Sequence, residues 1–386
     1  MKKDTRLTHA GLDPHNNHGV VNPPVYHAST ILYPTVEALE QAERTPFEGT
    51  RYGRRGTPTT FALEEAVAAL EGGYRSIAVP SGLSAITTAL MAFLKSGDHL
   101  LMVDTTYQPT RAFCNTVLAG FGVETTYYDP MADIGPLLRP NTKVVFLESP
   151  GSQTFEVQDV PAAAKAARAA GAVSMIDNTW SAGLYFSPFE HGVDISIQAA
   201  TKYIVGHSDV MLGTITTTKD TFVRTKRAAS LLGTSAAPDD CYLALRGLRT
   251  LSVRLARHQE SALAIARWLE NRPEVAHVLH PALPNCPGHE IWKRDFTGSN
   301  GLLSVVLEDY AKEAVTAMLD GMRLFSMGYS WGGYESLIIP FTPHTARTAT
   351  KWLPSGPCLR LHCGLEDVSD LMEDLEKGFE RLNAGR

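Results

Sequence analysis

Short apolar runs alternate with helical stretches from about residue 57 to residue 246, and this rhythm limits the possible folds more than any other feature of the sequence. The runs expected to be strands are residues 76–79, 99–103, 143–147, 173–176 and 195–198. The stretches expected to be helices include residues 61–70, 83–95, 110–121 and 160–170. Strands that are joined through helices pair in parallel, so we predict an α/β fold with a mainly parallel sheet covered by helices.

The segments on either side of this region have a different texture. Residues 1–56 contain few periodic stretches and many Gly, Pro, His and Asn residues, which is typical of an extended arm with turns and no core of its own. Beyond residue 246 we expect a long helix over 248–271, strands over 275–279, 301–307 and 359–362, and a last helix over 368–382. We therefore predict an arm over 1–56, a first domain over 57–246 and a smaller α+β domain over 247–386.

Composition excludes several classes of protein. The 386 residues carry a net charge of −6 and no block of Lys and Arg, which argues against a nucleic-acid arm or an anionic-membrane patch. The five cysteines are never spaced as C-x-x-C, no apolar segment follows the basic N-terminus, and no run is long enough to cross a bilayer. His277 and His280 would face opposite sides of a strand, so no metal site is predicted. We expect a soluble cytoplasmic enzyme.

Three motifs place polar groups beside the ends of expected strands. Ser81 and Gly82 begin a helix, whose free N–H groups and dipole favour a phosphate. Asp177 ends one apolar strand and Lys202 follows another. Taken singly, each has an ordinary explanation: a strand-to-helix turn, an Asx turn and a surface lysine. Together, a phosphate site, an acid for a ring nitrogen and a lysine for an aldehyde predict a pyridoxal phosphate (PLP) site.

Five longer stretches make a specific resemblance. They are residues 52–57 (YGRRGT), 146–152 (FLESPGS), 176–180 (IDNTW), 198–203 (QAATKY) and 329–336 (YSWGGYES). With them the chain resembles, over essentially its whole length, the Cys/Met-metabolism family of PLP-dependent enzymes, and most closely the bacterial cystathionine β-lyases. This resemblance implies PLP fold type I, like that of aspartate aminotransferase: a large domain with a mainly parallel seven-stranded sheet, a smaller C-terminal α+β domain and an N-terminal arm.

The resemblance also implies which residues bind the cofactor. Lys202 matches the lysine that forms the Schiff base, and Asp177 matches the partner of the pyridine nitrogen. Gly82 and Leu83 would offer backbone N–H groups to the phosphate, and Thr201 would add its hydroxyl.

Further positions match residues that meet the substrate or a neighbouring subunit. Tyr107 is similar to the tyrosine that stacks on the cofactor ring and assists proton transfer. Tyr52 and Arg54 resemble the pair that reaches the cofactor phosphate of a neighbouring subunit, which implies a homotetramer built from dimers that share active sites. Arg360 matches the arginine that binds the substrate carboxylate, and a guanidinium fork suits that planar group.

Departures from the wider family bear on the reaction. Gly151-Ser152-Gln153 stands where many relatives have an asparagine, and Ala199 replaces a serine. Tyr329 replaces a glutamate that γ-lyases and γ-synthases commonly have, Trp331 replaces a leucine beside Ser330, and Pro109 replaces a cysteine of methionine γ-lyases. Tyr329, Ser330 and Trp331, with Tyr52, are thus expected at the substrate.

The resemblance and these departures together imply α,β-elimination of L-cystathionine to homocysteine, pyruvate and ammonia, a reaction of methionine biosynthesis. A γ-lyase or γ-synthase of the same fold stays open as an alternative, and so does a PLP-binding regulatory protein.

Overall fold

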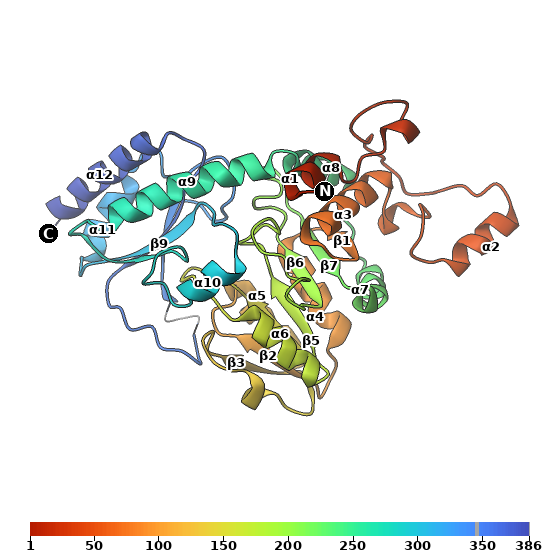
Figure 1. Ribbon diagram of the computed structural model, residues 1–386, viewed down its shortest axis with the longest axis horizontal. Coiled ribbons are helices and arrows are strands. Elements are labelled where there is room, and N and C mark those ends of the chain that lie inside the picture. The colour runs from red at the N-terminus through yellow and green to blue at the C-terminus, as the bar shows by residue number, and fades with distance from the viewer. Residues whose placement is uncertain (344–346, 386) are drawn as a thin grey trace.

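Two β-sheets organise the molecule, a seven-stranded one and a four-stranded one (Figure 1). The structure is a computed structural model and describes residues 1–343 and 347–385. The strands of the larger sheet are β1 (Arg75–Val79), β2 (His99–Val103), β3 (Glu124–Tyr128), β4 (Thr142–Glu148), β5 (Val173–Asp177), β6 (Ile195–Gln198) and β7 (Gly213–Thr217). Their order is β1-β7-β6-β5-β4-β2-β3, and β7 runs antiparallel to both of its neighbours while the pairs from β6 to β3 are parallel.

Both faces of the larger sheet are buried, which explains why its central strands are apolar throughout. Alternate residues of β2 point to opposite faces, so Leu100 and Met102 join one core and Leu101 and Val103 join another. The helices around this sheet are α3 (Pro58–Glu71), α4 (Gly82–Phe93), α5 (Gln108–Phe113), α6 (Val160–Ala169), α7 (Lys219–Leu231) and α8 (Pro238–Leu248). Helices α4 and α7 cover the first face and α6 the second.

The mainly parallel, helix-covered sheet is confirmed, and the five strands expected in it are present within a residue or two. Two further strands, β3 and β7, were not predicted. The helix expected over 110–121 is also interrupted, because α5 gives way to a π-helical turn over Cys114–Leu118.

The smaller sheet follows in the chain and is antiparallel. Its strands are β8 (Val275–Leu279), β9 (Leu302–Leu307), β10 (Leu337–Phe341) and β11 (Cys358–His362), in the order β10-β11-β9-β8. The helices of this part are α9 (Leu251–Leu269), α10 (His289–Asp295), α11 (Lys312–Asp320) and α12 (Val368–Ala384). Residues of α9, α11 and α12 share one buried core with the strands. The expected boundary at residue 246/247 lies between α8 and α9 and stays a prediction.

Within the first 56 residues, the segment around α2 (Val36–Arg44) extends away from this body, whereas the N-terminus lies against it (Figure 1). Helix α2 buries none of its residues, whereas α1 (Lys3–His9) buries Leu7 in a core shared with α3. The segment was expected to be extended with turns, and the two helices are an addition to that expectation.

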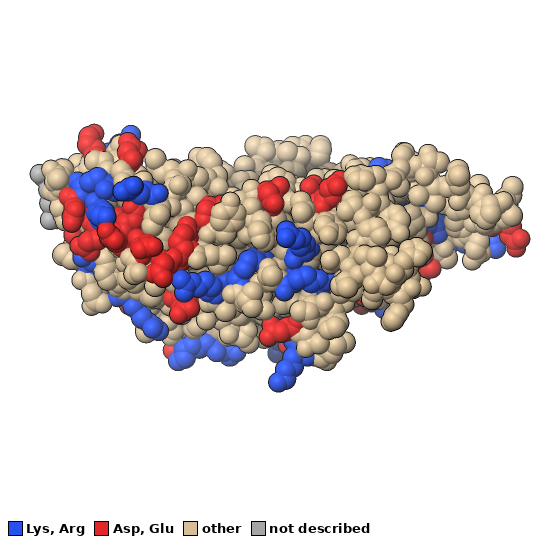
Figure 2. Space-filling view, turned by 90° about the horizontal axis from the view of Figure 1, so that it is seen from above, with Lys and Arg blue, Asp and Glu red and all other residues tan. Residues whose placement is uncertain are grey.

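The surface has two properties that bear on partners. On the face shown in Figure 2, basic and acidic side chains are intermixed, with no wide area of one sign. Among the described residues, no helix combines the length and the apolar character needed to cross a membrane.

Candidate active site

Lys202 lies just after β6, at the edge of the larger sheet where its parallel strands end. Its Nζ donates a hydrogen bond to Ser330 Oγ at 2.5 Å and lies 5.3 Å from the centre of the Trp331 ring. Burial, followed by the charge of Arg360, lowers the pKa of Lys202 to about 8, although Asp177 opposes this shift. An amine with such a pKa is available in its neutral, nucleophilic form near neutral pH.

Asp177 is the last residue of β5, the strand next to β6. Its Oδ1 accepts hydrogen bonds from the backbone N–H of Thr179 at 3.0 Å and from the Thr179 hydroxyl at 2.5 Å. Burial raises the pKa of Asp177, while Thr179 and the charge of Lys202 oppose the rise. A cation placed beside this carboxyl group would therefore favour its ionised form.

The third predicted element is the start of α4. Ser81 caps the helix by accepting the N–H of Ser84 at 3.1 Å. Within the part of the chain that the structure describes, the N–H groups of Gly82 and Leu83 donate to no other group, so they can receive an anion. Glycine at position 82 also has a packing reason that the sequence did not reveal: a Cβ there would lie 2.5 Å from the Cβ of Ala199.

Tyr107 stands at the end of the loop after β2 and is held by a residue that was not predicted to belong to the site. Glu148 ends β4 beside Asp177, and its Oε2 accepts the backbone N–H of Tyr107 at 2.7 Å. Burial, and then the neighbouring Asp177, raise the pKa of Glu148 well above its ordinary value. Burial, then Asp177 and Glu148, also raise the pKa of Tyr107, which keeps this phenol protonated. The sequence did contain a signal that Glu148 belongs to the site, because this residue stands at a strand end and within one of the five motif stretches.

Arg360 reaches the site from the middle of β11 in the smaller sheet. It is only 9% exposed, and its Nη2 donates to the carbonyl of Ser330 at 2.8 Å. Its Nε has no partner among the described residues, and burial lowers its pKa to about 10. Ser330 thus touches both Lys202, through its hydroxyl, and Arg360, through its carbonyl. Ser330 itself has a φ of 80°, a strained conformation for a residue other than glycine.

Four other predicted residues lie differently. The hydroxyl of Thr201 exchanges hydrogen bonds with the backbone of Leu212. Arg54 donates to the carbonyl of Ser230 at 2.7 Å, and Tyr52 is 45% exposed; no described contact joins either of them to Lys202 of the same chain. Tyr329 is 94% exposed and touches the site only through its neighbour in the chain, Ser330.

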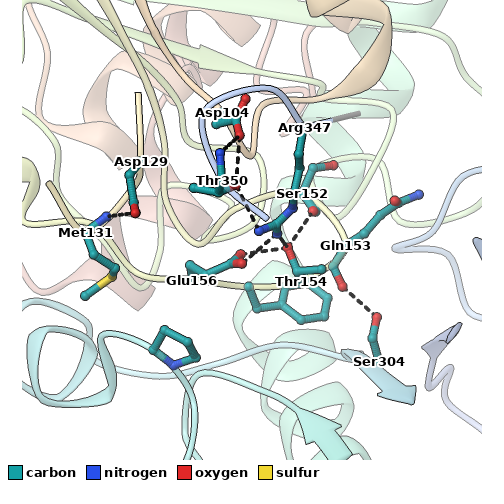
Figure 3. A network of polar contacts seen from close by, with 12 residues as sticks. Asp104, Asp129, Met131, Ser152, Gln153, Thr154, Glu156, Ser304, Arg347 and Thr350 are labelled. Carbon is teal, nitrogen blue, oxygen red and sulfur yellow. Dashed lines mark hydrogen bonds and ion pairs between the residues drawn. The ribbon is translucent and has the colours of Figure 1, made fainter. Parts of the chain in front are cut away.

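A clamp joins the two sheets next to this site (Figure 3). Asp104, at the start of the loop that carries Tyr107, accepts the consecutive N–H groups of residues 348–350 at 2.9, 3.0 and 2.8 Å. It also forms an ion pair with Arg111 at 2.5 Å. The hydrogen bonds from Thr348 and Thr350 outweigh burial and lower the pKa of Asp104.

The other half of the clamp is Arg347. It forms a buried ion pair with Glu156 at 2.6 Å and also donates to Thr154 (Figure 3). Residues 347–350 belong to the connection between β10 and β11. This clamp therefore holds the chain segment that leads to Arg360 against the loop that carries Tyr107.

The assembled groups have a definite chemical capacity. The site offers an anion position at a helix start, a buried carboxyl group, an amine with a lowered pKa and a partly free guanidinium group. Such a set can hold a phosphorylated carbonyl compound beside an amino-acid carboxylate. Its amine can also accept a proton from a bound ligand and donate it again.

Comparisons with known proteins agree on the type of protein. A family model described as "Cys/Met metabolism PLP-dependent enzyme" matches residues 4–380. The chain is 49% identical to "Cystathionine beta-lyase" of Salmonella typhimurium over 98% of both chains, and 48% identical to "Cystathionine beta-lyase MetC" of Escherichia coli over 99% of both. Among solved structures, cystathionine gamma synthase from Xanthomonas oryzae pv. oryzae in complex with cystathionine superposes with a TM-score of 0.91, 31% identity and full coverage of both chains.

Proposed function

Because this chain belongs to the Cys/Met-metabolism family of PLP-dependent enzymes, we propose that it cleaves L-cystathionine by α,β-elimination. With one water, the reaction gives homocysteine, pyruvate and ammonia, so the protein is a carbon–sulfur lyase of methionine biosynthesis. One observation carries the proposal: Ser330 accepts hydrogen bonds from both Lys202 and Arg360. A proton-accepting amine and a carboxylate-binding guanidinium therefore meet at one residue, as the adjacent Cα–H and carboxylate of an amino acid require.

The donor set of the structure fits PLP. The two unpaired N–H groups at the start of α4, those of Gly82 and Leu83, suit a phosphate. Asp177 suits a protonated pyridine nitrogen, and Lys202, with its pKa lowered to about 8, suits an aldehyde. Thr201 would join the phosphate site only by turning its hydroxyl proton away from the Leu212 carbonyl.

When bound, PLP withdraws electrons from the substrate's Cα, which makes the Cα proton removable. Arg360 binds the α-carboxylate with its free N–H groups and so directs that proton toward Lys202. The neutral amine of Lys202 removes the proton and becomes an ammonium group, and that ammonium group or the protonated Tyr107 then supplies a proton to the departing sulfur. Positioned acid–base groups of this kind typically contribute about 10²–10⁴-fold.

The loop that holds Ser330 supports elimination at Cβ rather than at Cγ. Removal of a second proton, from Cβ, is required for γ-elimination, and Tyr329 stands where relatives with that chemistry commonly have a glutamate. Tyr329 is 94% exposed, and Trp331 places an indole 5.3 Å from Lys202, so this loop offers no carboxylate beside the amine.

The surroundings of the site are part of the same proposal. Residues 1–56 form an arm that lends Tyr52 and Arg54 to the cofactor phosphate, and Tyr52 to the substrate, of a neighbouring subunit within a homotetramer. Its support is the exposure of both the arm and Tyr52 on the single chain. Residues 57–246 bind the cofactor and 247–386 form the C-terminal domain. The five cysteines are buried and unpaired, which supports a reducing, cytoplasmic compartment.

The test is the product formed from L-cystathionine by the purified, PLP-loaded protein. Pyruvate together with homocysteine would support β-elimination, whereas 2-oxobutyrate together with cysteine would assign the chain to the γ-lyases. Absence of any keto acid would reject the proposed reaction.

A further inference from the structure

Behind Lys202 lies a cluster of four rings, Tyr203, His258, Trp331 and His362, called here the ring cluster, and the proposed function leaves all of them but Trp331 without a role. The ring of Tyr203 lies 5.4 Å from Trp331, 5.3 Å from His258 and 5.9 Å from His362. His258 and His362 are 5.2 Å apart, and both are fully buried. A buried histidine pair next to a reactive lysine is an unusual use of two polar side chains.

Three members of the ring cluster belong to the segments that carry Lys202, Ser330 and Arg360. Tyr203 follows Lys202 in the chain, Trp331 follows Ser330, and His362 stands two residues after Arg360 on β11. In a strand, residues two apart lie on the same face, so His362 and Arg360 both face the loop of Ser330. The cluster therefore occupies the point where the two sheets meet behind the site.

Two backbone contacts connect His362 to that loop. Its Nε2 lies 3.1 Å from the backbone nitrogen of Gly332, whose N–H it can accept, and 3.1 Å from the carbonyl oxygen of Gly333, to which a protonated Nε2 can donate. Gly332 has a φ of +89°, and a Cβ on it would lie 2.9 Å from the backbone nitrogen of Tyr203 and 3.0 Å from the carbonyl carbon of Lys202. Position 332 thus tolerates only glycine, and His362 holds the very residue that presses against the backbone of Lys202.

The protonation state of His362 suits this role. Burial, and then the neighbouring His258, hold the pKa of His362 well below its ordinary value, so the ring stays neutral. His258 donates its Nδ1–H to the carbonyl of Cys363 at 2.7 Å, which leaves its Nε2 without a proton. A neutral His362 can serve either contact: with its proton on Nδ1, Nε2 accepts the N–H of Gly332, and with its proton on Nε2 it donates to the carbonyl of Gly333.

We propose that His362 is a positioning residue for the reaction: by holding the backbone of Gly332 and Gly333 it fixes Ser330 and Trp331 between Lys202 and Arg360. This inference rests on the proposed function, because it concerns the same site. Loss of the ring would remove the hydrogen-bond partner of the loop backbone at Gly332 and Gly333 and would let the loop move. Ser330 would then shift relative to both of the groups that it touches.

The chain supplies a matched control in His280. This histidine is also fully buried, and its Nδ1 accepts one backbone N–H, that of Ala282, at 3.1 Å. His362→Leu and His280→Leu therefore remove the same kind of contact. The rescue variant is His362→Gln, whose amide can accept from Gly332 or donate to Gly333 in place of Nε2, and its partner is His362→Asn, whose amide is too short to reach the loop. The Gln and Asn pair keeps the comparison available if the leucine variant does not fold.

Three quantities are measured for each variant: kcat and KM for L-cystathionine, the thermal midpoint, and the pH midpoint of the visible absorbance of lysine-bound PLP. His362→Leu and His362→Asn are expected to lose about 10- to 100-fold in kcat/KM, since small misplacements at a site have costs of this size. They should also shift the pH midpoint, because Lys202 loses its fixed partner. His362→Gln should recover most of the wild-type kcat/KM and most of the wild-type pH midpoint. His280→Leu should change only the thermal midpoint.

Equal changes of kcat/KM in His362→Leu and His280→Leu at equal thermal destabilisation would overturn the inference. So would a His362→Gln variant no better than His362→Asn. The absorbance titration needs no turnover, so it reports on His362 even if the wild-type protein forms no pyruvate, an outcome that would reject the proposed function alone.

Discussion

The two sheets contribute to the site in opposite ways. The larger sheet supplies Asp177 and Glu148 from strand ends, and Lys202 and Tyr107 from the loops that follow, where backbone and side chains are free to face a ligand. The smaller sheet supplies Arg360 from the middle of a strand whose five residues are all buried. Groups that move protons thus stand on an edge that loops can adjust, and the group that recognises the carboxylate is fixed within a core.

The largest expected effect removes the reactive group of the larger sheet. Lys202→Ala should abolish the visible absorbance of lysine-bound PLP and reduce turnover by about 10⁴-fold or more. Lys226→Ala is the control, because Lys226 is also largely buried but pairs with Glu64 away from the site. Visible absorbance that survives in Lys202→Ala would show that another residue holds the cofactor.

The second prediction breaks the connection between the sheets. Arg347→Leu leaves the buried carboxylate of Glu156 without its ion pair and should lower the free energy of unfolding by about 3–5 kcal/mol in urea titration. It should also reduce kcat/KM, because the segment that leads to Arg360 is released.

Arg272→Leu provides the comparison for that variant, since Arg272 pairs with Glu274 and Glu376 and all three belong to the smaller unit. It should lower stability and leave kcat/KM near the wild-type value. If both variants affect stability and activity alike, the clamp has no special part in joining the two sheets.

The third prediction concerns recognition by the smaller sheet. Arg360→Ala should raise KM for L-cystathionine by about 10²–10⁴-fold, because two charge-assisted hydrogen bonds, at about 1.5–3 kcal/mol each, are lost. Arg360→Lys should recover little, since an ammonium group cannot reproduce the planar fork. Steady-state kinetics on the three proteins give the answer, and a KM that stays unchanged in Arg360→Ala would place the carboxylate elsewhere.

The smallest expected effect concerns the electrostatic influence of Arg360, in the smaller sheet, on the pKa of Lys202, beside the larger sheet. The neutral amine of Lys202 is the form that captures PLP, and its pKa is about 8, so uptake by the apoprotein should accelerate as the pH rises through about 8 and level off above it. Arg360 lowers this pKa, so Arg360→Ala should move the midpoint to higher pH. Stopped-flow absorbance against pH measures both curves, and coincident midpoints would mean that the two groups do not interact.

Sequence patterns predicted most strands of both sheets, and the strands that they missed were missed for physical reasons. The central strands are buried on both faces and therefore read as apolar runs. Strand β7, with the sequence GTITT, was missed although it is fully buried, because its three threonines do not read as an apolar run. Two of their hydroxyls are paired with strand β1, Thr216 with Ser76 at 2.7 Å and Thr217 with the carbonyl of Arg75 at 3.1 Å, and the sequence does not reveal these contacts. Strand β10 was missed because Pro340 argues against a strand, and β10 is an edge strand, where proline is tolerated.

The site residues also divide into those that the sequence could predict and those that it could not. Lys202 and Asp177 could be predicted because each follows an apolar strand and lies in a recognisable motif. Glu148 and the clamp on Asp104 depend on contacts between distant parts of the chain, such as that of Asp104 with residues 348–350, and no local pattern reports those. The reason for glycine at position 82 was likewise hidden, because it lies in the packing of Ala199.

The loop around Ser330 also determines where new substrate preferences could evolve. Gly332 has no room for a side chain, so almost any replacement there would be eliminated by selection for an intact enzyme. Tyr329, three residues earlier, is 94% exposed and can vary at little cost to folding. A library of variants at position 329 should therefore contain many folded proteins, and one at position 332 few. Evolution toward bulkier thioethers would accordingly begin at the tyrosine.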